Sequence, residues 1–195
     1  MGKWIKIGII ALAVIFLYRL VAGSYNNMVS KGEMVTKSWQ DVESDYQRRL
    51  DLIPNLVNTV KGYADFEKST LTAVIEARAQ ATQVKVDANN ITPEALKNYQ
   101  AAQGQLSSSL SRLLVTVEQY PDLKANQNFL ELQAELAGTE NRIKVARNKF
   151  NETVKEYNTY VKSFPRNLFA SMFGFAPKTY FEADEAASKV PEVKF

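Results

Sequence analysis

The chain has 195 residues, of which 46% are hydrophobic and 23% are charged, and its net charge is +3. This composition indicates one folded domain with a short appendage, and the small, scattered charge argues against nucleic-acid binding. The sequence contains no cysteine and no histidine. It therefore lacks disulfides, cysteine nucleophiles, imidazole acid–base chemistry and Cys/His zinc sites, and we expect neither a cofactor nor a metal.

Residues 1–23 are predicted to form a single membrane-spanning helix. The stretch from Trp4 to Ala22 is long enough to cross a bilayer, which needs roughly 20 apolar residues, provided that Lys6 and Arg19 extend toward the two interfaces. Trp4 and Tyr18 lie where interfacial aromatic residues are found. The expected anchor residues are Trp4, Ile7, Ile10, Leu12, Val14, Phe16, Leu17 and Tyr18.

A cleaved signal peptide and a buried core helix are the alternatives for this segment. Lys3 and Lys6 would form the basic region of a signal peptide, and residues 21–23 loosely resemble a cleavage site, although Arg19 fits poorly so near it. A core helix is not normally apolar all round at the N-terminus.

The orientation of the span is set by the lysines and arginines near its ends, and their numbers on the two sides are nearly equal. We place the helical domain outside the cytoplasm because Lys3, Lys6 and the α-amine crowd the short N-terminal side.

Residues 24–165 are predicted to form an elongated antiparallel bundle of long helices, so the fold class is all-α. Apolar residues recur every seven positions in paired rows, which favours shallow packing angles between helices. We expect three long arms, or four helices if Pro54 splits the first arm, which continues to about Ala81. The paired rows are Met28, Val35 and Val42 with Trp39, Tyr46 and Ile53; Leu96, Gln103, Leu110 and Val117 with Tyr99, Leu106, Leu113 and Tyr120; and Phe129, Leu136, Ile143, Phe150, Tyr157 and Phe164 with Leu132, Thr139, Ala146, Thr153 and Tyr160.

Helix starts and stops are also visible in the sequence. Residues 92–94, Thr-Pro-Glu, form a strong helix start, and Pro121 and Pro165 end the helices that precede them. Residues 166–195 form an aromatic-rich tail that we expect to pack on the bundle. Its large apolar residues must be buried on the bundle, on a partner or in the membrane interface.

The stretch "RRLDLIPNLVNTV", residues 48–60, places a proline inside an amphipathic helix, where it costs about 3 kcal/mol. One interpretation is a bend, in which a side chain such as Asn55 or an arginine satisfies the freed carbonyl of Leu50, or Asp51 caps a restarted helix. The other is a partner-binding corner. Neighbouring arginines point about 100° apart on a helix, which disfavours a shared phosphate. The candidate residues are Arg48, Arg49, Asp51, Pro54 and Asn55.

The residues "YNNMVSKGEMVTKSWQDVESDYQRRLDLIPNLVNTVKGYADFEKSTLTAVIEARA" (Tyr25–Ala79) resemble the LemA family. The tail from Ser163 to Phe195, with "FGF" and "YFEADEAASKVPEVKF", resembles that family's C-terminal signature. Phe66 is a departure, because many relatives carry a polar or basic residue there. The resemblance covers essentially the whole chain and implies a bacterial membrane protein with a helical-bundle domain. It implies no particular biochemical activity.

Together these features favour a non-enzymatic scaffold or adaptor of the bacterial cell envelope, anchored by one span in the cytoplasmic (inner) membrane. Its expected partners are the lipid bilayer, unidentified envelope proteins and possible further copies of itself. The alternative is a self-assembling structural protein that forms oligomers at the membrane. An enzyme that uses carboxylates or tyrosines is the least favoured interpretation, because charged residues between heptad rows are typical of a solvated face.

Overall fold

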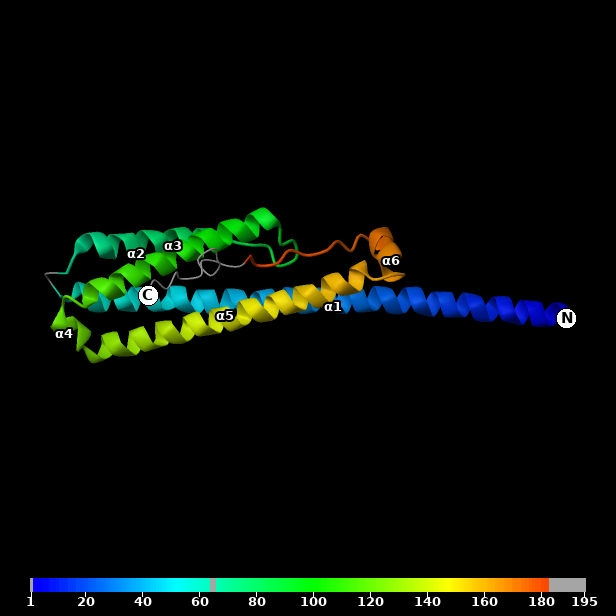
Figure 1. Ribbon diagram of the computed structural model, residues 1–195, viewed down its shortest axis with the longest axis horizontal. Coiled ribbons are helices and arrows are strands. Elements are labelled where there is room, and N and C mark those ends of the chain that lie inside the picture. Colours follow the sequence, from blue (N-terminus) through cyan, green and yellow to red (C-terminus); the bar gives the residue numbers. More distant parts are fainter. Residues whose placement is uncertain (1, 64–65, 183–195) are drawn as a thin grey trace, which may run out of the picture.

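The computed structural model describes residues 2–63 and 66–182, and within them the chain forms a long helical rod without a β-strand (Figure 1). The predicted all-α fold, with an elongated bundle of long helices, is confirmed. The helices are α1 (Lys3–Lys61), α2 (Lys68–Gln83), α3 (Pro93–Val117), α4 (Pro121–Lys124), α5 (Gln127–Lys162) and α6 (Arg166–Phe173).

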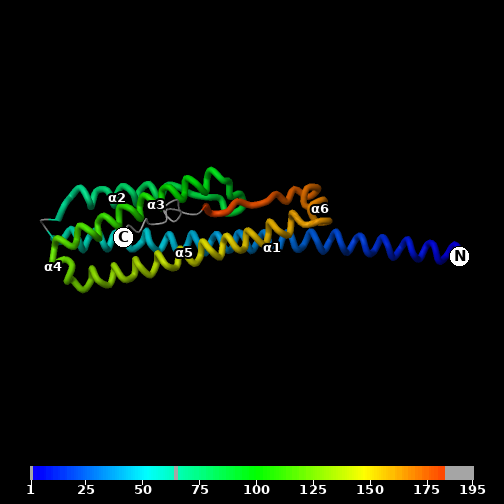
Figure 2. Tube along the Cα trace, in the orientation of Figure 1, coloured from blue at the N-terminus to red at the C-terminus, as the bar shows by residue number. Residues whose placement is uncertain are grey.

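The bundle consists of two helix pairs. In one pair, α1 lies against α5, and α2 lies against α3 in the other (Figure 2). Ion pairs join Lys31 to Glu156 and Arg48 to Glu135, both at 3.2 Å. Because the residue number rises on α1 as it falls on α5, these two helices are antiparallel. The 59 residues of α1 give it a length of about 90 Å at 1.5 Å per residue.

The heptad rows form the core, and Trp39 and Phe150 are wholly inaccessible to solvent. Leu132, Tyr120, Thr153 and Tyr160 are only half-buried. Phe164 departs from its row, because it is 80% exposed and Val161 is buried in its place. Phe164 lies beyond Lys162, the last residue of α5, so it no longer follows the helical repeat.

The first arm does not divide at Pro54. Instead, α1 continues through Pro54 to Lys61, and α2, which begins at Lys68, runs back along the bundle. Phe66, the departure noted in the sequence, is buried with its ring 4.9 Å from that of Tyr120. Both helices bury the same kind of apolar stripe, so its periodicity did not show where the chain turns back.

Side-chain caps stabilise the first turns of two helices, α3 and α5. The Thr92 hydroxyl accepts a hydrogen bond from the Ala95 amide at 3.1 Å, with Pro93 as the first residue of α3, as the sequence predicts. Asn126 caps α5 in the same way by accepting from the Phe129 amide at 3.1 Å. These caps satisfy amides that the first helical turn leaves without a partner.

After α6 the chain runs back along the bundle and is held by two asparagines of α5 (Figure 1). The Asn158 side chain accepts from the Lys178 amide at 2.7 Å and donates to its carbonyl at 2.8 Å. Asn151 forms the same pair of bonds with Phe181, at 2.8 and 3.2 Å. Seven helical residues and three extended ones both span about 10 Å, so the spacings match.

The tail also adds aromatic surface to the core. The Phe181 ring stacks on Trp39 with centroids 5.7 Å apart and meets Phe150 edge-on at 5.3 Å. Residues 166–182 thus pack on the bundle, whereas residues 183–195 of the predicted tail lie outside the described part of the chain.

We expect Asn158→Ala to lower the free energy of unfolding by about 1–3 kcal/mol, because it leaves the amide and carbonyl of Lys178 without their partner. Asn148→Ala, on an exposed face of the same helix, is the control and should change the stability by less than about 0.5 kcal/mol. Urea unfolding of the full-length protein in detergent measures both. Equal losses in the two variants would show that the asparagine does not hold the tail.

Candidate functional site

The proline at the centre of the predicted partner-binding stretch removes a hydrogen-bond donor, and a side chain from another helix supplies a replacement donor. Pro54 has no amide hydrogen, so the carbonyl of Leu50 lacks its helical donor. The Arg78 Nε of α2 donates to that carbonyl at 3.0 Å. An arginine was among the expected donors, but this one comes from outside the stretch. Asp51 caps no restarted helix, since α1 is unbroken.

Arg49 is turned into the bundle and is only 3% exposed. One of its terminal nitrogens donates to Ser107 Oγ at 2.8 Å and to Glu140 Oε2 at 3.0 Å. The other donates to Gln103 Oε1 at 2.6 Å, and the guanidinium lies 5.0 Å from the centre of the Tyr46 ring. Arg49 therefore joins α1 to both α3 and α5, and it links the two helix pairs.

The other candidate residues of the stretch lie on the surface. Arg48 is paired with Glu135 of α5 at 3.2 Å, and Asp51 accepts a hydrogen bond from Gln47 at 2.8 Å. Pro54 and Asn55 are exposed. The structure thus separates Arg49 from the rest, and partner binding by the four surface residues stays a prediction.

A cavity of about 340 Å³ opens beside Arg49, between α3 and α5. Leucines supply much of its wall, and Arg49 and Glu140 are among its polar lining residues. Glu140 neutralises Arg49, so the cavity offers no free positive charge to an anion. Its lining includes Leu110, Leu114, Leu136, Ser107, Ser111 and Ala137.

The described residues do not assemble a cluster of metal ligands. Within residues 2–63 and 66–182, no three histidine, cysteine, aspartate or glutamate side chains are arranged to hold a metal ion. Burial raises the pKa of the Tyr99 hydroxyl, and it also raises the pKa of Tyr157. Both phenols are therefore protonated at neutral pH, and they pack as core residues rather than serving as bases.

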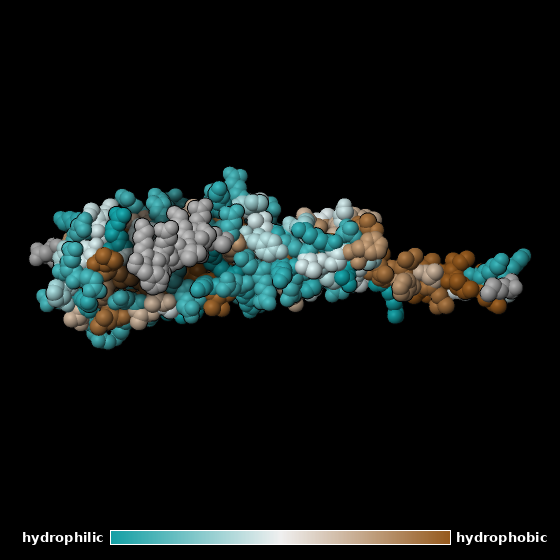
Figure 3. Space-filling model, viewed as in Figure 1, coloured by the Kyte–Doolittle hydropathy of each residue, from teal (hydrophilic) through white to brown (hydrophobic). Residues whose placement is uncertain are grey.

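The predicted anchor residues project from the free end of α1, which extends beyond the rest of the rod (Figure 3). We call this end, residues 3–23, the apolar shaft. In the part of the chain that the structure describes, α1 is the one helix long and apolar enough to cross a membrane. Burial begins near Leu20, and Ser24 is the first fully buried residue. Each of the following is more than half exposed: Trp4, Ile7, Ile10, Leu12, Val14, Phe16, Leu17 and Tyr18.

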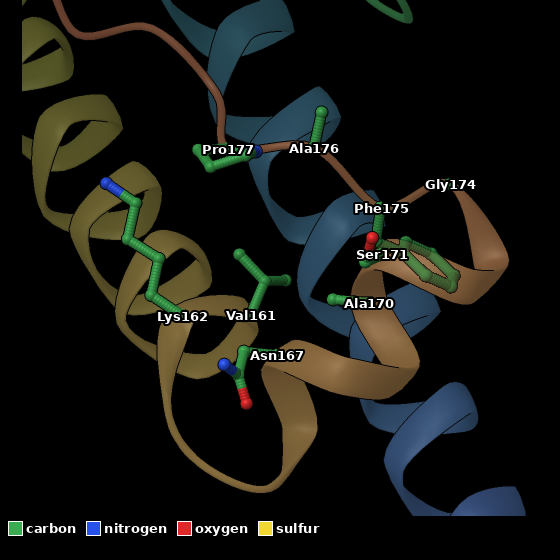
Figure 4. A pocket seen from close by; sticks show the side chains of 9 residues that line it. All are labelled: Val161, Lys162, Asn167, Ala170, Ser171, Gly174, Phe175, Ala176 and Pro177. Carbon is green, nitrogen blue, oxygen red and sulfur yellow. The ribbon is translucent and has the colours of Figure 1, made fainter.

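Next to this shaft, α6 and the segment after it form the end of the bundle. The rings of Phe173 and Phe175 meet Tyr25 of α1 edge-on at 5.2 and 5.5 Å. A cavity of about 500 Å³ lies between the end of α5, α6 and the tail, and Lys162 and Asn167 contribute to its wall (Figure 4). Sequence reasoning missed the contact of α6 with α1 because Tyr25 is far along the chain from Phe173 and Phe175.

We expect the costs of Arg78→Ala and Pro54→Ala to be coupled. Alone, Arg78→Ala should destabilise the protein by about 1–3 kcal/mol, since the Leu50 carbonyl loses its donor. In the Pro54→Ala background a backbone amide replaces that donor, so Arg78→Ala should cost at least about 1 kcal/mol less. Urea unfolding of the four proteins gives the coupling energy. Arg112→Ala on the exposed face of α3 is the control, and purely additive effects of Arg78 and Pro54 would contradict the assignment.

Comparison with known proteins places this architecture in a family. A model of the LemA family matches residues 38–195, a range that includes most of the bundle and the tail held by Asn151 and Asn158. Protein LemA of Metamycoplasma hominis is 24% identical over 174 residues, which are 89% of this chain and 76% of that protein.

Two magnetosome proteins show a similar degree of likeness. Magnetosome protein MamQ 2 of Paramagnetospirillum magneticum is 25% identical over 90% of this chain and 71% of its own length. MamQ of Magnetospirillum gryphiswaldense is 24% identical over 93% of this chain and 73% of its own length. An exposed apolar helix joined to such a bundle fits a membrane-anchored protein. The chain belongs to the LemA family.

Proposed function

We propose that the protein is a non-enzymatic scaffold or adaptor of the bacterial cell envelope, held in the cytoplasmic membrane by a single span. The observation that carries this proposal is the continuity of α1, which serves as both apolar shaft and bundle helix. Without a break between them, a rigid rod about 57 Å long follows the shaft from residue 24 to residue 61. Such a rod offers long lateral surfaces to other proteins at a set distance from the bilayer.

The distribution of exposed apolar residues favours binding to other proteins over self-assembly. Large exposed apolar residues occur singly along the rod, such as Val115 on α3 and Val145 on α5, and single residues of this kind are normal on monomeric proteins. The self-assembling structural protein is therefore the second candidate.

We expect the span to be retained and the bundle to lie outside the cytoplasm. The chain has no cysteine, so Lys155→Cys, on an exposed position of α5, gives a single thiol. An impermeant thiol reagent should label it in intact spheroplasts, and the protein should stay in the membrane after a carbonate wash. Gly2→Cys is the matched control and should be labelled only after lysis.

The opposite labelling pattern would place the bundle in the cytoplasm. A soluble product that begins near Ser24 would identify residues 1–23 as a cleaved signal peptide.

We expect a photo-crosslinker at Asn55, on the exposed stretch around Pro54, to capture a different protein in living cells. Mass spectrometry of the purified adduct identifies it. Arg48→Ala should lower the yield severalfold if that stretch binds the partner, whereas Lys149→Ala, on an exposed part of α5, should not. Adducts at multiples of the chain's own mass would instead support the self-assembling alternative.

A further inference from the structure

We infer that α6 is a second membrane-contacting element, which lies in the headgroup interface of the bilayer that α1 crosses and prefers anionic phospholipid. The inference rests on the membrane anchoring proposed above. Three independent features carry it: the apolar face of α6, its level along α1, and the charge of the surrounding surface.

Two large apolar residues of α6, Leu168 and Met172, face outward. Leu168 is 59% exposed and Met172 is 66% exposed, and residues four apart share one face of a helix. Phe164, just before the helix, is 80% exposed, whereas Ala170 on the inner side is buried. A surface helix of a soluble protein turns its apolar side chains inward, so this arrangement is typical of a helix that rests on lipid.

The position of α6 along α1 matches the membrane interface. The predicted span ends at Ala22, and Tyr25 is three residues further on, or about 4.5 Å along the helix axis. The rings of Phe173 and Phe175 contact Tyr25, which sets the level of α6. Aromatic residues concentrate at this depth, and interfacial helices bury their apolar face about 5–10 Å into the boundary of the bilayer.

Figure 3 shows apolar surface continuing from the shaft onto this end of the bundle. Residues 20–23 of α1, which precede Tyr25, are half-buried rather than exposed like those before them, and α6 packs against α1. The apolar stripe of α6 is therefore continuous with the membrane-spanning surface. That continuity favours lipid over a separate partner as its occupant.

The same end of the molecule is basic. Residues 7–32 and 157–181 contain no aspartate or glutamate, and their cations are Arg19, Lys31, Lys162, Arg166 and Lys178. Lys31 is neutralised by Glu156 at 3.2 Å. Lys162 lies on the wall of the cavity next to α6, together with the polar Asn167 and Ser171 (Figure 4). Cations at this depth attract the phosphates of anionic lipids.

The test uses the full-length protein in vesicles, with a solvent-sensitive fluorophore on one introduced cysteine. Leu168→Cys and Met172→Cys report on α6, Leu12→Cys on the span, and Val145→Cys, exposed on α5, on the aqueous surface. In vesicles of phosphatidylcholine with phosphatidylglycerol, the labels at 168 and 172 should emit as in an apolar environment. Lipids that carry a quencher near the headgroup should quench both, and the label at 145 should behave as in water.

The preference for anionic lipid is tested by charge reversal. Lys162→Glu should lower the ratio of inserted to aqueous label at position 168 at least about fivefold, the effect of one basic residue near an anionic surface. Lys144→Glu, an equally exposed change in the distal part of α5, should leave it unchanged. Equal ratios in phosphatidylcholine alone and in the mixture would overturn the lipid preference.

The outcomes separate this inference from the anchoring on which it rests. A label at Leu12 in lipid with aqueous labels at 168 and 172 would overturn the role of α6 and leave the anchor intact. Aqueous labels at all three positions would overturn both. A label at 168 could also be shielded from water without being quenched by lipid. Together with crosslinking between identical chains at that position, this result would assign the apolar face of α6 to a second copy.

Discussion

The hydrogen bond from Arg78 to the Leu50 carbonyl is the interaction on which the rest of the structure depends. It supplies the donor that Pro54 removes, so α1 passes through a residue that elsewhere ends or kinks a helix. The same bond ties α2 to α1. An unbroken α1 then extends from the shaft to the far end of the bundle, and Arg78 and Arg49 tie it to the pair formed by α2 and α3.

Polar contacts determine the alignment of an otherwise repetitive core. Rows of apolar residues at seven-residue spacing are nearly equivalent after a slip of one heptad, whereas hydrogen-bonded side chains are not. Arg49 finds Ser107, Gln103 and Glu140 in only one alignment of α1 with α3 and α5. Asn151 and Asn158 likewise fix where the tail lies on α5. These few contacts select one arrangement among several of similar apolar burial.

The two ends of the rod differ in chemistry, and that difference orients the proposed scaffold. At the shaft end, apolar and basic residues gather around Tyr25 and α6. Along the body, charged residues of both signs alternate and pair across helices, as between Arg48 and Glu135. Because α1 is continuous, the lipid-facing end determines the direction in which the body projects, and the lateral surfaces remain free for proteins.

The sequence by itself determined the helical class, the apolar shaft, the core rows and the capped start at Thr92, because each depends on residues a few positions apart. It also placed Trp39 and Phe150 in the core, since heptad spacing identifies one helix face. The candidate site was less predictable. Arg49 continues the row of Met28, Val35 and Val42 at seven-residue spacing, and this signal for its burial was missed. The partners that Arg49 binds on α3 and α5 depend on tertiary packing.

Tertiary structure alone decided the return of α2 along the bundle, the pairing of Arg78 with Leu50, the docking of the tail and the level of α6. An apolar stripe has the same period in one long helix as in two that fold back, so periodicity carries no information about the turn. Hydrogen-bond partners such as Asn158 and Lys178 meet because the tail packs on α5. Since α5 carries several asparagines among similar neighbours, the sequence alone does not single out Asn158 as the one that binds the tail. The physical reason is that local spacing specifies which face of a helix is buried, whereas the partner of that face depends on contacts between distant parts of the chain.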